Sequence, residues 1–338
     1  MIADPLLRWY DRHARDLPWR VGPSERAAGE QADPYRVWLS DFMLQQTTVP
    51  HATRYFMSFV ERWPTVDALA AAADDEVMAA WAGLGYYARA RNLLKCARMV
   101  AASGHFPETR DGLRALPGIG AYTSGAVAAI AFGEPVPAVD GNVDRVFARL
   151  LALDTDWKTA KKTIADTVAT IVPDSRPGEF AEALMDLGAT VCTPKRPNCL
   201  LCPLADHCKA LAEGKPERYP IKAKKAVSPT RRGHAFLLRR DDTILLERRP
   251  ARGLLGGMLG LPGSEWTEEA PTAPDFPIDA HWNEAGDVRH VFTHFNLVLT
   301  VWTAEMDRSP AHGQWHSVDA VEGLPSVFKK AARLALQL

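Results

Sequence analysis

Four of the five cysteines lie between positions 192 and 208, with the spacing C-x6-C-x2-C-x5-C. Thiolates this close together repel one another, so they persist as neighbours only when they are bridged or bound to a metal. Four cysteines suit either a tetrahedral zinc ion or a [4Fe–4S] cluster. Zinc usually takes two short knuckles that lie far apart, so this compact run favours one [4Fe–4S] cluster held by Cys192, Cys199, Cys202 and Cys208. Zinc is the alternative, and two disulfides are the least favoured interpretation because nothing in the sequence indicates secretion.

A glycine-rich segment at 116–125 offers a second kind of chemistry, the binding of a phosphate. Gly118 and Gly120 let the backbone turn tightly and approach an external group, and the helix that follows presents unsatisfied N–H groups to it. Taken alone, the pattern is better explained as an ordinary turn between helices. Its place ahead of the four-cysteine run favours a DNA contact, and the segment resembles the helix-hairpin-helix element of DNA repair glycosylases.

Asp140 stands directly before a predicted helix whose Val143, Val146 and Phe147 share an apolar face. As a helix N-cap, Asp140 would stabilise that helix by about 1 kcal/mol. The N–H groups of a helix N-terminus also keep a carboxylate ionised. Asp140 could therefore stabilise a positive charge that develops beside it, and the two roles are compatible.

The elements that position these groups are mostly helical up to residue 220. Asp33 and Pro34 form a helix start, with an N-cap followed by proline at the first helical position. The apolar periodicity predicts helices near 35–49, 66–82, 88–102, 121–132, 142–153, 158–171 and 178–190.

The chain changes character after the cysteines. Residues 213–232 mix Gly, Pro, Lys and Arg with few apolar residues, which is typical of a linker. Beyond it, short strand-like runs at 235–238, 244–247 and 295–302 precede a final helix near 325–337. This order predicts a separate α+β domain.

Composition limits the function classes less than local charge does. Lys plus Arg total 40 and Asp plus Glu total 41, so net charge says nothing about partners. Basic runs without acids at 86–99 and 222–232 favour a polyanion partner only weakly. We expect no membrane association, because no apolar run is long enough to span a bilayer, and a reducing cytoplasmic location with Cys96 as a buried thiol.

Two further segments make the resemblance specific. They are WLSDFMLQQTT at 38–48 and GLGYYARARNL at 83–93. With the glycine-rich segment, VDGNV at 139–143 and the cysteine spacing, the chain resembles the adenine DNA glycosylases of the MutY family over nearly its whole length.

The resemblance implies two folded regions. Residues 1–220 would form a mostly α glycosylase region similar to endonuclease III, in which 31–135 make a six-helix barrel and 1–30 join 136–220 in an iron–sulfur cluster domain. Residues 233–338 would form an α+β Nudix-like domain that recognises 8-oxoguanine. The acidic helix that a Nudix hydrolase needs for magnesium is absent from this sequence, so we expect no nucleotide hydrolysis.

The implied activity is removal of adenine mispaired with 8-oxoguanine, or with guanine, after the adenine is flipped out of the duplex. Asp140 matches the carboxylate that stabilises the sugar cation, and Asn142 the residue that orients it. Tyr122 stands where related lyases carry lysine, which implies a monofunctional enzyme. Asp41 stands in place of the family's general-acid glutamate, which would protonate N7 of adenine, and is one methylene shorter. A displacement of about 1 Å can cost on the order of a hundredfold in rate.

The resemblance also assigns residues to DNA recognition. Gln46 and Tyr86 would wedge beside 8-oxoguanine, with Leu44 and Thr47 close by. The adenine pocket would include Arg15, Trp19, Arg20 and Glu182, each of which could equally be a packing or surface residue. Phe292, Thr293 and His294 match a lesion-sensing Phe-Ser-His loop, with threonine in place of serine.

Three alternatives remain open at this stage. A pyrimidine-damage lyase of the endonuclease III type is disfavoured by Tyr122 and by the extra domain. An iron–sulfur protein that binds lesions without cleaving them is motivated by Asp41. The third is a zinc-bound structural DNA binder. The expected partner is double-stranded DNA with an A:8-oxoguanine or A:G mispair, bound by a monomer.

Overall fold

The structure is a computed structural model that describes residues 2–221, 228–250, 253–269, 273–306 and 313–337. It divides into two compact units, Met1–Lys224 and Lys225–Leu338. The boundary falls inside the predicted linker 213–232, of which residues 222–227 lie outside the described residues. Part of that segment is regular, because a 3-10 turn covers Pro216–Arg218 and a strand begins at Thr230.

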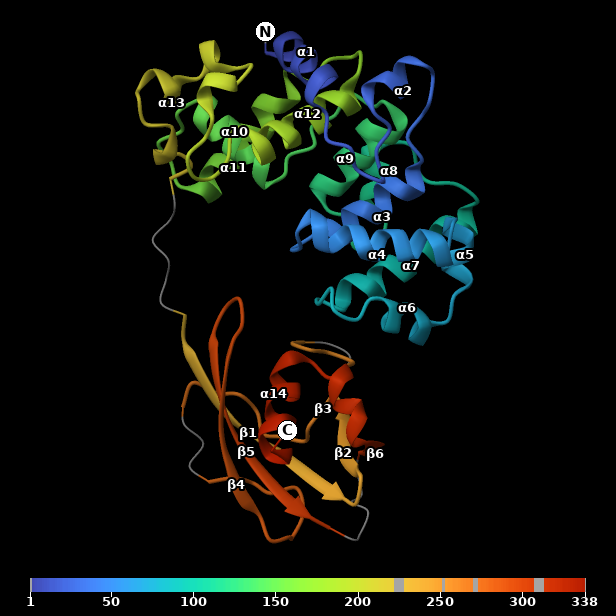
Figure 1. Cartoon of the computed structure of the whole chain (residues 1–338), viewed down its shortest axis with the longest axis vertical. Helices are drawn as coiled ribbons and strands as arrows, with labels where there is room; N and C mark the ends of the chain where they lie inside the picture. The colour runs from blue at the N-terminus through green and yellow to red at the C-terminus, as the bar shows by residue number, and fades with distance from the viewer. Residues whose placement is uncertain (1, 222–227, 251–252, 270–272, 307–312, 338) are drawn as a thin grey trace. The chain divides into compact units, whose positions relative to one another are not determined.

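Within its described residues, the regular elements of the first unit are helices, apart from one isolated β-bridge between Asp156 and Ile221 (Figure 1). Its helices are α1 (Ala3–His13), α2 (Pro23–Ala27), α3 (Pro34–Leu44), α4 (Val49–Arg62), α5 (Val66–Ala71), α6 (Asp74–Ala80), α7 (Ala88–Ser103), α8 (Arg110–Arg114), α9 (Ala121–Phe132), α10 (Gly141–Leu150), α11 (Trp157–Ala169), α12 (Pro177–Thr190) and α13 (Lys209–Ala212). Helix α3 packs against α4, α7 and α9, and α12 packs against α1, α9 and α10. The chain's first helix therefore lies beside one of its last, and α9 joins the two groups.

Two predicted helices are not single helices in the structure. The segment 35–49 is not one helix: α3 ends at Leu44, and α4 begins at Val49 after a turn in which Gln46 has φ 60°. Pro50 sits in the first turn of α4, where its missing N–H costs nothing, but it would break a continuous helix. The segment 66–82 is split into α5 and α6 by the extended residues Ala72 and Ala73.

Several elements were not predicted from the sequence. They are helices α1, α2, α4, α8 and α13 and three strands of the second unit. By contrast, α7, α9 and α12 match their predictions within about a residue at each end. The Asp33 start is confirmed, because its side chain accepts a hydrogen bond of 2.8 Å from the Tyr35 N–H.

The second unit is a mixed sheet covered by one helix. Its strands are β1 (Thr230–Arg240), β2 (Thr243–Arg248), β3 (Leu259–Gly260), β4 (Asn283–Val291), β5 (Asn296–Glu305) and β6 (Gln314–Ser317), and α14 (Ser326–Leu336) follows. The order is β3-β2-β1-β5-β4 with β6 on β2, and β1 is parallel to β5. Helix α14 packs against β4, β5 and β1, which confirms the predicted α+β class.

The prediction that Cys96 is a buried thiol is confirmed. Cys96 is buried on α7 within the helical core, and burial raises the pKa of its thiol to about 12. Across the described ranges, no helix is both long and apolar enough to cross a bilayer.

Candidate active site

A cavity of about 640 Å³ in the first unit brings together the predicted catalytic residues and the residues predicted for the adenine pocket and the wedge. Its walls come from α3, α9, α10 and α12 and from the chain segment between α1 and α2. The predicted residues that line it are Arg15, Trp19, Arg20, Asp41, Leu44, Gln46, Thr47, Tyr86, Tyr122, Asp140, Asn142 and Glu182. Gly118 and Gly120 lie outside it. Positions far apart in the sequence thus meet at one concave site.

Asp41 contributes a buried carboxyl group from α3, with only 6% of its surface exposed. The Tyr122 hydroxyl donates to its Oδ1 over 3.3 Å, while its Oδ2 has no partner in the part of the chain that the structure describes. Burial raises the pKa of Asp41 to about 8; the Tyr122 bond opposes this rise and the nearby Asp140 adds to it. At neutral pH the group therefore keeps its proton.

Asp140 has the opposite surroundings in the same cavity. It is the N-cap of α10, and its Oδ1 accepts from the N–H groups of Asn142 at 2.9 Å and Val143 at 2.8 Å. Its Oδ2 accepts from the Asn142 side-chain amide at 2.7 Å. Three N–H donors at a helix N-terminus suit the ionised form of a carboxylate. The N-cap geometry predicted for Asp140 is confirmed.

Asn142 is in turn held by Arg145, a residue that the sequence patterns did not single out. The Arg145 Nη2 donates to Asn142 Oδ1 at 2.9 Å and to the Gly188 carbonyl at 2.6 Å. Its Nε donates to the Cys192 carbonyl at 2.8 Å. This contact connects the side chain beside Asp140 to the first cysteine of the run, and only the fold reveals it.

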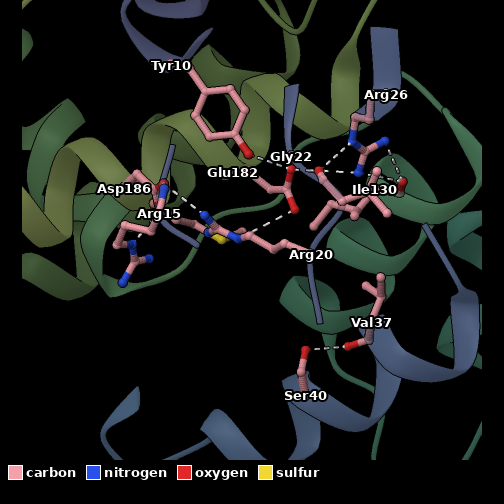
Figure 2. A network of polar contacts seen from close by, with 12 residues as sticks. Tyr10, Arg15, Arg20, Gly22, Arg26, Val37, Ser40, Ile130, Glu182 and Asp186 are labelled. Atoms are coloured by element: carbon pink, nitrogen blue, oxygen red, sulfur yellow. Dashed lines mark hydrogen bonds and ion pairs between the residues drawn. The ribbon is translucent and has the colours of Figure 1, made fainter. Parts of the chain in front are cut away.

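A buried ionic network on α12 closes another wall of the cavity (Figure 2). Glu182 accepts from the Tyr10 hydroxyl at 2.9 Å and lies 3.5 Å from Arg20 Nε. Asp186 accepts from Arg20 Nη1 at 2.8 Å and from Arg15 Nε at 2.6 Å. Burial alone would lower the pKa of Arg20, but the two carboxylates raise it. Arg15, Arg20 and Glu182 were predicted pocket residues, whereas Tyr10 and Asp186 were missed.

The predicted wedge residues lie at the edge of the same cavity. Gln46 and Tyr86 both adopt left-handed backbone conformations, with φ of 60° and 48°. Such a conformation costs an L-residue about 1–3 kcal/mol, so the surrounding structure must hold it. Tyr86 is 57% exposed and Gln46 is also exposed, while Leu44 and Thr47 are half-buried. The side chains of Gln46 and Tyr86 are therefore accessible to a large ligand.

The two glycines of the hairpin have different constraints. Gly118 has φ 78°, and a Cβ there would lie 2.8 Å from Asn92 Cβ and 3.0 Å from the Phe42 ring. Gly120 is the N-cap of α9, in extended conformation, with nothing within 4 Å of an added Cβ. Packing thus explains Gly118, whereas Gly120 leaves the helix N-terminus open to a ligand.

The four clustered cysteines surround one small cavity, together with Arg149. All four are free thiols, so the disulfide alternative is wrong. The Arg149 Nη1 donates to Cys192 Sγ at 3.3 Å, and the Arg149 carbonyl lies 3.6 Å from Cys208 Sγ. Within the described ranges, no group of three His, Cys, Asp or Glu side chains is placed to hold a single ion. The fit to a metal cluster therefore rests on the shared cavity and on the softness of four sulfur ligands.

In the second unit, the predicted lesion-sensing loop joins β4 to β5. Phe292 is half-buried and stacks on Trp266, with ring centroids 5.8 Å apart, and it also contacts Phe295. Thr293 and His294 are exposed at the turn. Phe292 thus anchors the loop to the core of this unit, and the two polar residues face outward.

Comparisons with known proteins define the class of this chain. Residues 39–171 match the HhH-GPD superfamily of base excision DNA repair proteins. Residues 192–208 match the iron–sulfur binding domain of endonuclease III, and 234–334 match the NUDIX domain. The fold and site therefore define a helix-hairpin-helix base excision repair protein with a [4Fe–4S] cluster, which Cys192, Cys199, Cys202 and Cys208 would hold, and a C-terminal Nudix-like domain.

Relatives identify the family. The chain is 31% identical to the adenine DNA glycosylase of Buchnera aphidicola (subspecies Schizaphis graminum), over 98% of this chain and 97% of that protein. It is 34% identical to the human and 39% identical to the Arabidopsis thaliana adenine DNA glycosylase, in each case over 88% of this chain. The chain spans 65% and 56% of the lengths of those two proteins. It belongs to the adenine DNA glycosylase family.

Solved structures agree with this fold. A thermostable thymine-DNA glycosylase is 26% identical, with a TM-score of 0.54 over 62% of this chain and 95% of that one. Endonuclease III in a trapped covalent DNA intermediate is 24% identical, with a TM-score of 0.51 over 63% of this chain and 95% of that one. The latter similarity shows the shared fold alone.

The buried network yields a prediction about stability. Replacing Asp186 with alanine leaves Arg15 and Arg20 without their shared carboxylate in a buried site, so we expect the free energy of unfolding to fall by about 3 kcal/mol or more. Urea denaturation followed by circular dichroism measures the loss. Asp166→Ala is the control, because Asp166 pairs with Lys162 on an exposed helix face and its loss should leave the midpoint unchanged. Equal midpoints for the two variants would contradict the network's role.

Proposed function

We propose that this protein hydrolyses the bond between adenine and deoxyribose where adenine is mispaired with 8-oxoguanine, or with guanine, in double-stranded DNA. The observation that carries the proposal is the pair of carboxyl groups in one cavity. Asp41 is buried and keeps its proton at neutral pH, while Asp140 is surrounded by N–H donors. Glycoside hydrolysis requires two carboxyl groups of the enzyme, one protonated and one ionised, that act on the same substrate.

The proposed reaction begins with adenine flipped into the cavity, since the bond cannot be reached inside the stack. Asp41 transfers its proton to N7 of adenine, with the Tyr122 hydroxyl orienting the acid. The bond to C1′ breaks and its electron pair leaves with the purine. Asp140 stabilises the cation that forms on the sugar, and Asn142 holds Asp140 in place. Water then adds to C1′, and the proton that it releases restores the acid form of Asp41. The DNA is left with an abasic site.

The shorter side chain at position 41 gives the first test of this reaction. Asp41→Asn keeps the shape but removes the acid, so we expect single-turnover adenine release to slow by about 10²–10⁴-fold. Asp41→Glu restores the family's reach, and a faster rate than that of the native protein would show that reach limits the native enzyme. A variant no faster than native would show that the pocket already compensates.

Asp140→Asn is the companion variant in the same assay, run on A:8-oxoguanine and A:T duplexes at fixed salt. We expect it to abolish excision while mismatch binding persists, because asparagine cannot stabilise a cation. Excision at the native rate by Asp140→Asn would overturn the mechanism. Tight mismatch binding by native protein without any base release would favour the alternative of a lesion-binding protein.

The pH dependence follows from the state of Asp41. Its pKa of about 8 lies above the usual value for aspartate, so the reactive form is the protonated one, which is lost as pH rises. We expect the single-turnover excision rate to fall tenfold per pH unit well above pH 8, with a plateau on the acid side. Asp41→Glu should keep a basic limb with a different midpoint. A native rate that stays flat between pH 7 and about pH 10 would exclude Asp41 as the acid.

We further propose that the enzyme is monofunctional. Tyr122 supplies no amine to attack C1′, but Lys161 lies at the cavity edge, 3.9 Å from the buried Asp144. We expect borohydride to trap no covalent adduct between native protein and an abasic duplex. A trapped adduct would favour the endonuclease III type of lyase, and its loss in Lys161→Met would identify the amine.

The remaining assignments are proposals of the same kind. Gln46 and Tyr86 would fill the gap left by the flipped base, and the exposed Thr293 and His294 would contact 8-oxoguanine. We propose that the protein acts as a monomer on DNA in the reducing cytoplasm. There, four cysteines would hold the cluster and Cys96 would stay a free thiol.

A further inference from the structure

Arg89, on α7, is a buried arginine that has no acidic partner among the residues that the structure describes. Only 9% of its surface is exposed, and no carboxylate in the described part of the chain raises its pKa, which burial lowers. Its guanidinium instead donates to four backbone carbonyls. These belong to Phe42 (2.9 Å) and Gln45 at the end of α3, and to Leu84 (2.9 Å) and Gly85 (3.4 Å) before α7.

Two of these carbonyls have a special position. The Gln45 carbonyl belongs to the peptide group that precedes Gln46, and the Gly85 carbonyl to the one that precedes Tyr86. The orientation of a peptide group sets φ of the residue that follows it. One guanidinium therefore holds both peptide groups whose orientation defines the left-handed residues Gln46 and Tyr86.

Arginine suits this task for physical reasons. Its planar fork directs one terminal nitrogen to Gln45 and the other to Gly85, whereas a lysine ammonium is a single point. The charge sits at the carbonyl end of α3, where the helix dipole favours a cation. The rings of Trp81 and Tyr86 lie 5.4 and 5.5 Å from the guanidinium carbon and stabilise it further.

We propose that Arg89 is a positioning residue that joins the turn carrying Gln46 to the turn carrying Tyr86, so that both side chains meet the base opposite adenine in one fixed geometry. The inference rests on the proposed function for its consequence on DNA. The hydrogen bonds from Arg89 to the two turns, which we call the Arg89 clamp, are a property of the free protein. Arg89 itself also lines the cavity, and we expect it to act on recognition of the opposite base through the two turns that it joins.

The first experiment uses the free protein and is independent of activity. Hydrogen exchange followed by mass spectrometry compares native protein with Arg89→Lys. We expect faster exchange in segments 42–48 and 83–88 together, and unchanged exchange in α9 and α10. Arg98→Lys is the matched control, because Arg98 lies on the same helix and donates to the carbonyls of Ala70 and Ala72 away from the cavity. Unchanged exchange in either segment of Arg89→Lys would overturn the clamp.

The second experiment is a double-mutant cycle on A:8-oxoguanine duplex affinity. Arg89→Lys should weaken binding on the order of tenfold in the native background. In the Gln46→Ala/Tyr86→Ala background, it should have almost no effect, because the groups through which it acts are gone. A purely structural role predicts the same loss in both backgrounds, and that result, or no loss in the native one, would overturn the proposal.

A further variant covers the case in which Arg89→Lys does not fold. Arg89→Gln keeps two N–H donors and enters the same cycle, with thermal melting and the visible absorbance of the cluster as checks of folding. If neither variant folds, Arg89 is required for the core as a whole and the narrower proposal is wrong. Failure of the proposed function is seen separately, as the absence of adenine release by native protein.

Discussion

The arrangement of the first unit depends on two carboxylates that are buried on α12 and must pair with cations. Glu182 and Asp186 are almost fully inaccessible to water, and an unpaired buried charge costs several kcal/mol. Their cations come from the segment between α1 and α2, which Arg15 and Arg20 anchor to α12, and from Arg26 on α2, which lies 3.7 Å from Glu182. The same contacts form one wall of the cavity. A single electrostatic requirement therefore connects the start of the chain to the last long helix of the first unit and also shapes the site.

The proposed chemistry of the cavity depends on the contrast between the surroundings of two aspartates. Asp41 sits inside the helical core with one weak donor, whereas Asp140 caps a helix and accepts three N–H bonds. Desolvation penalises the charged form of the first, and aligned donors suit the charged form of the second. Identical side chains are thus suited to opposite tasks in the proposed reaction. The contrast requires that one cavity be bordered by a core helix and by a helix N-terminus.

Features that depend only on neighbouring residues in the sequence were mostly predicted correctly. Asp33 with Pro34 marks the start of α3, and Asp140 caps α10, because an N-cap needs only residues within three positions of itself. The turn at 45–48 was wrongly predicted as helix, since its left-handed Gln46 is held by Arg89, a residue distant in sequence. Helix α4 was missed for a related reason, as only that turn separates it from α3.

The sequence by itself determined the residue types and their order: cysteines at metal-ligating spacing, a glycine hairpin, and a carboxylate before a helix. These features depend on neighbours along the chain, and so they are visible without a fold. The tertiary structure decided which groups lie within reach of one another and how much water surrounds them. The raised pKa of Asp41, the partners of Asp186 and the carbonyls around Arg89 all follow from burial and from long-range contacts. No spacing between neighbouring residues can encode those quantities.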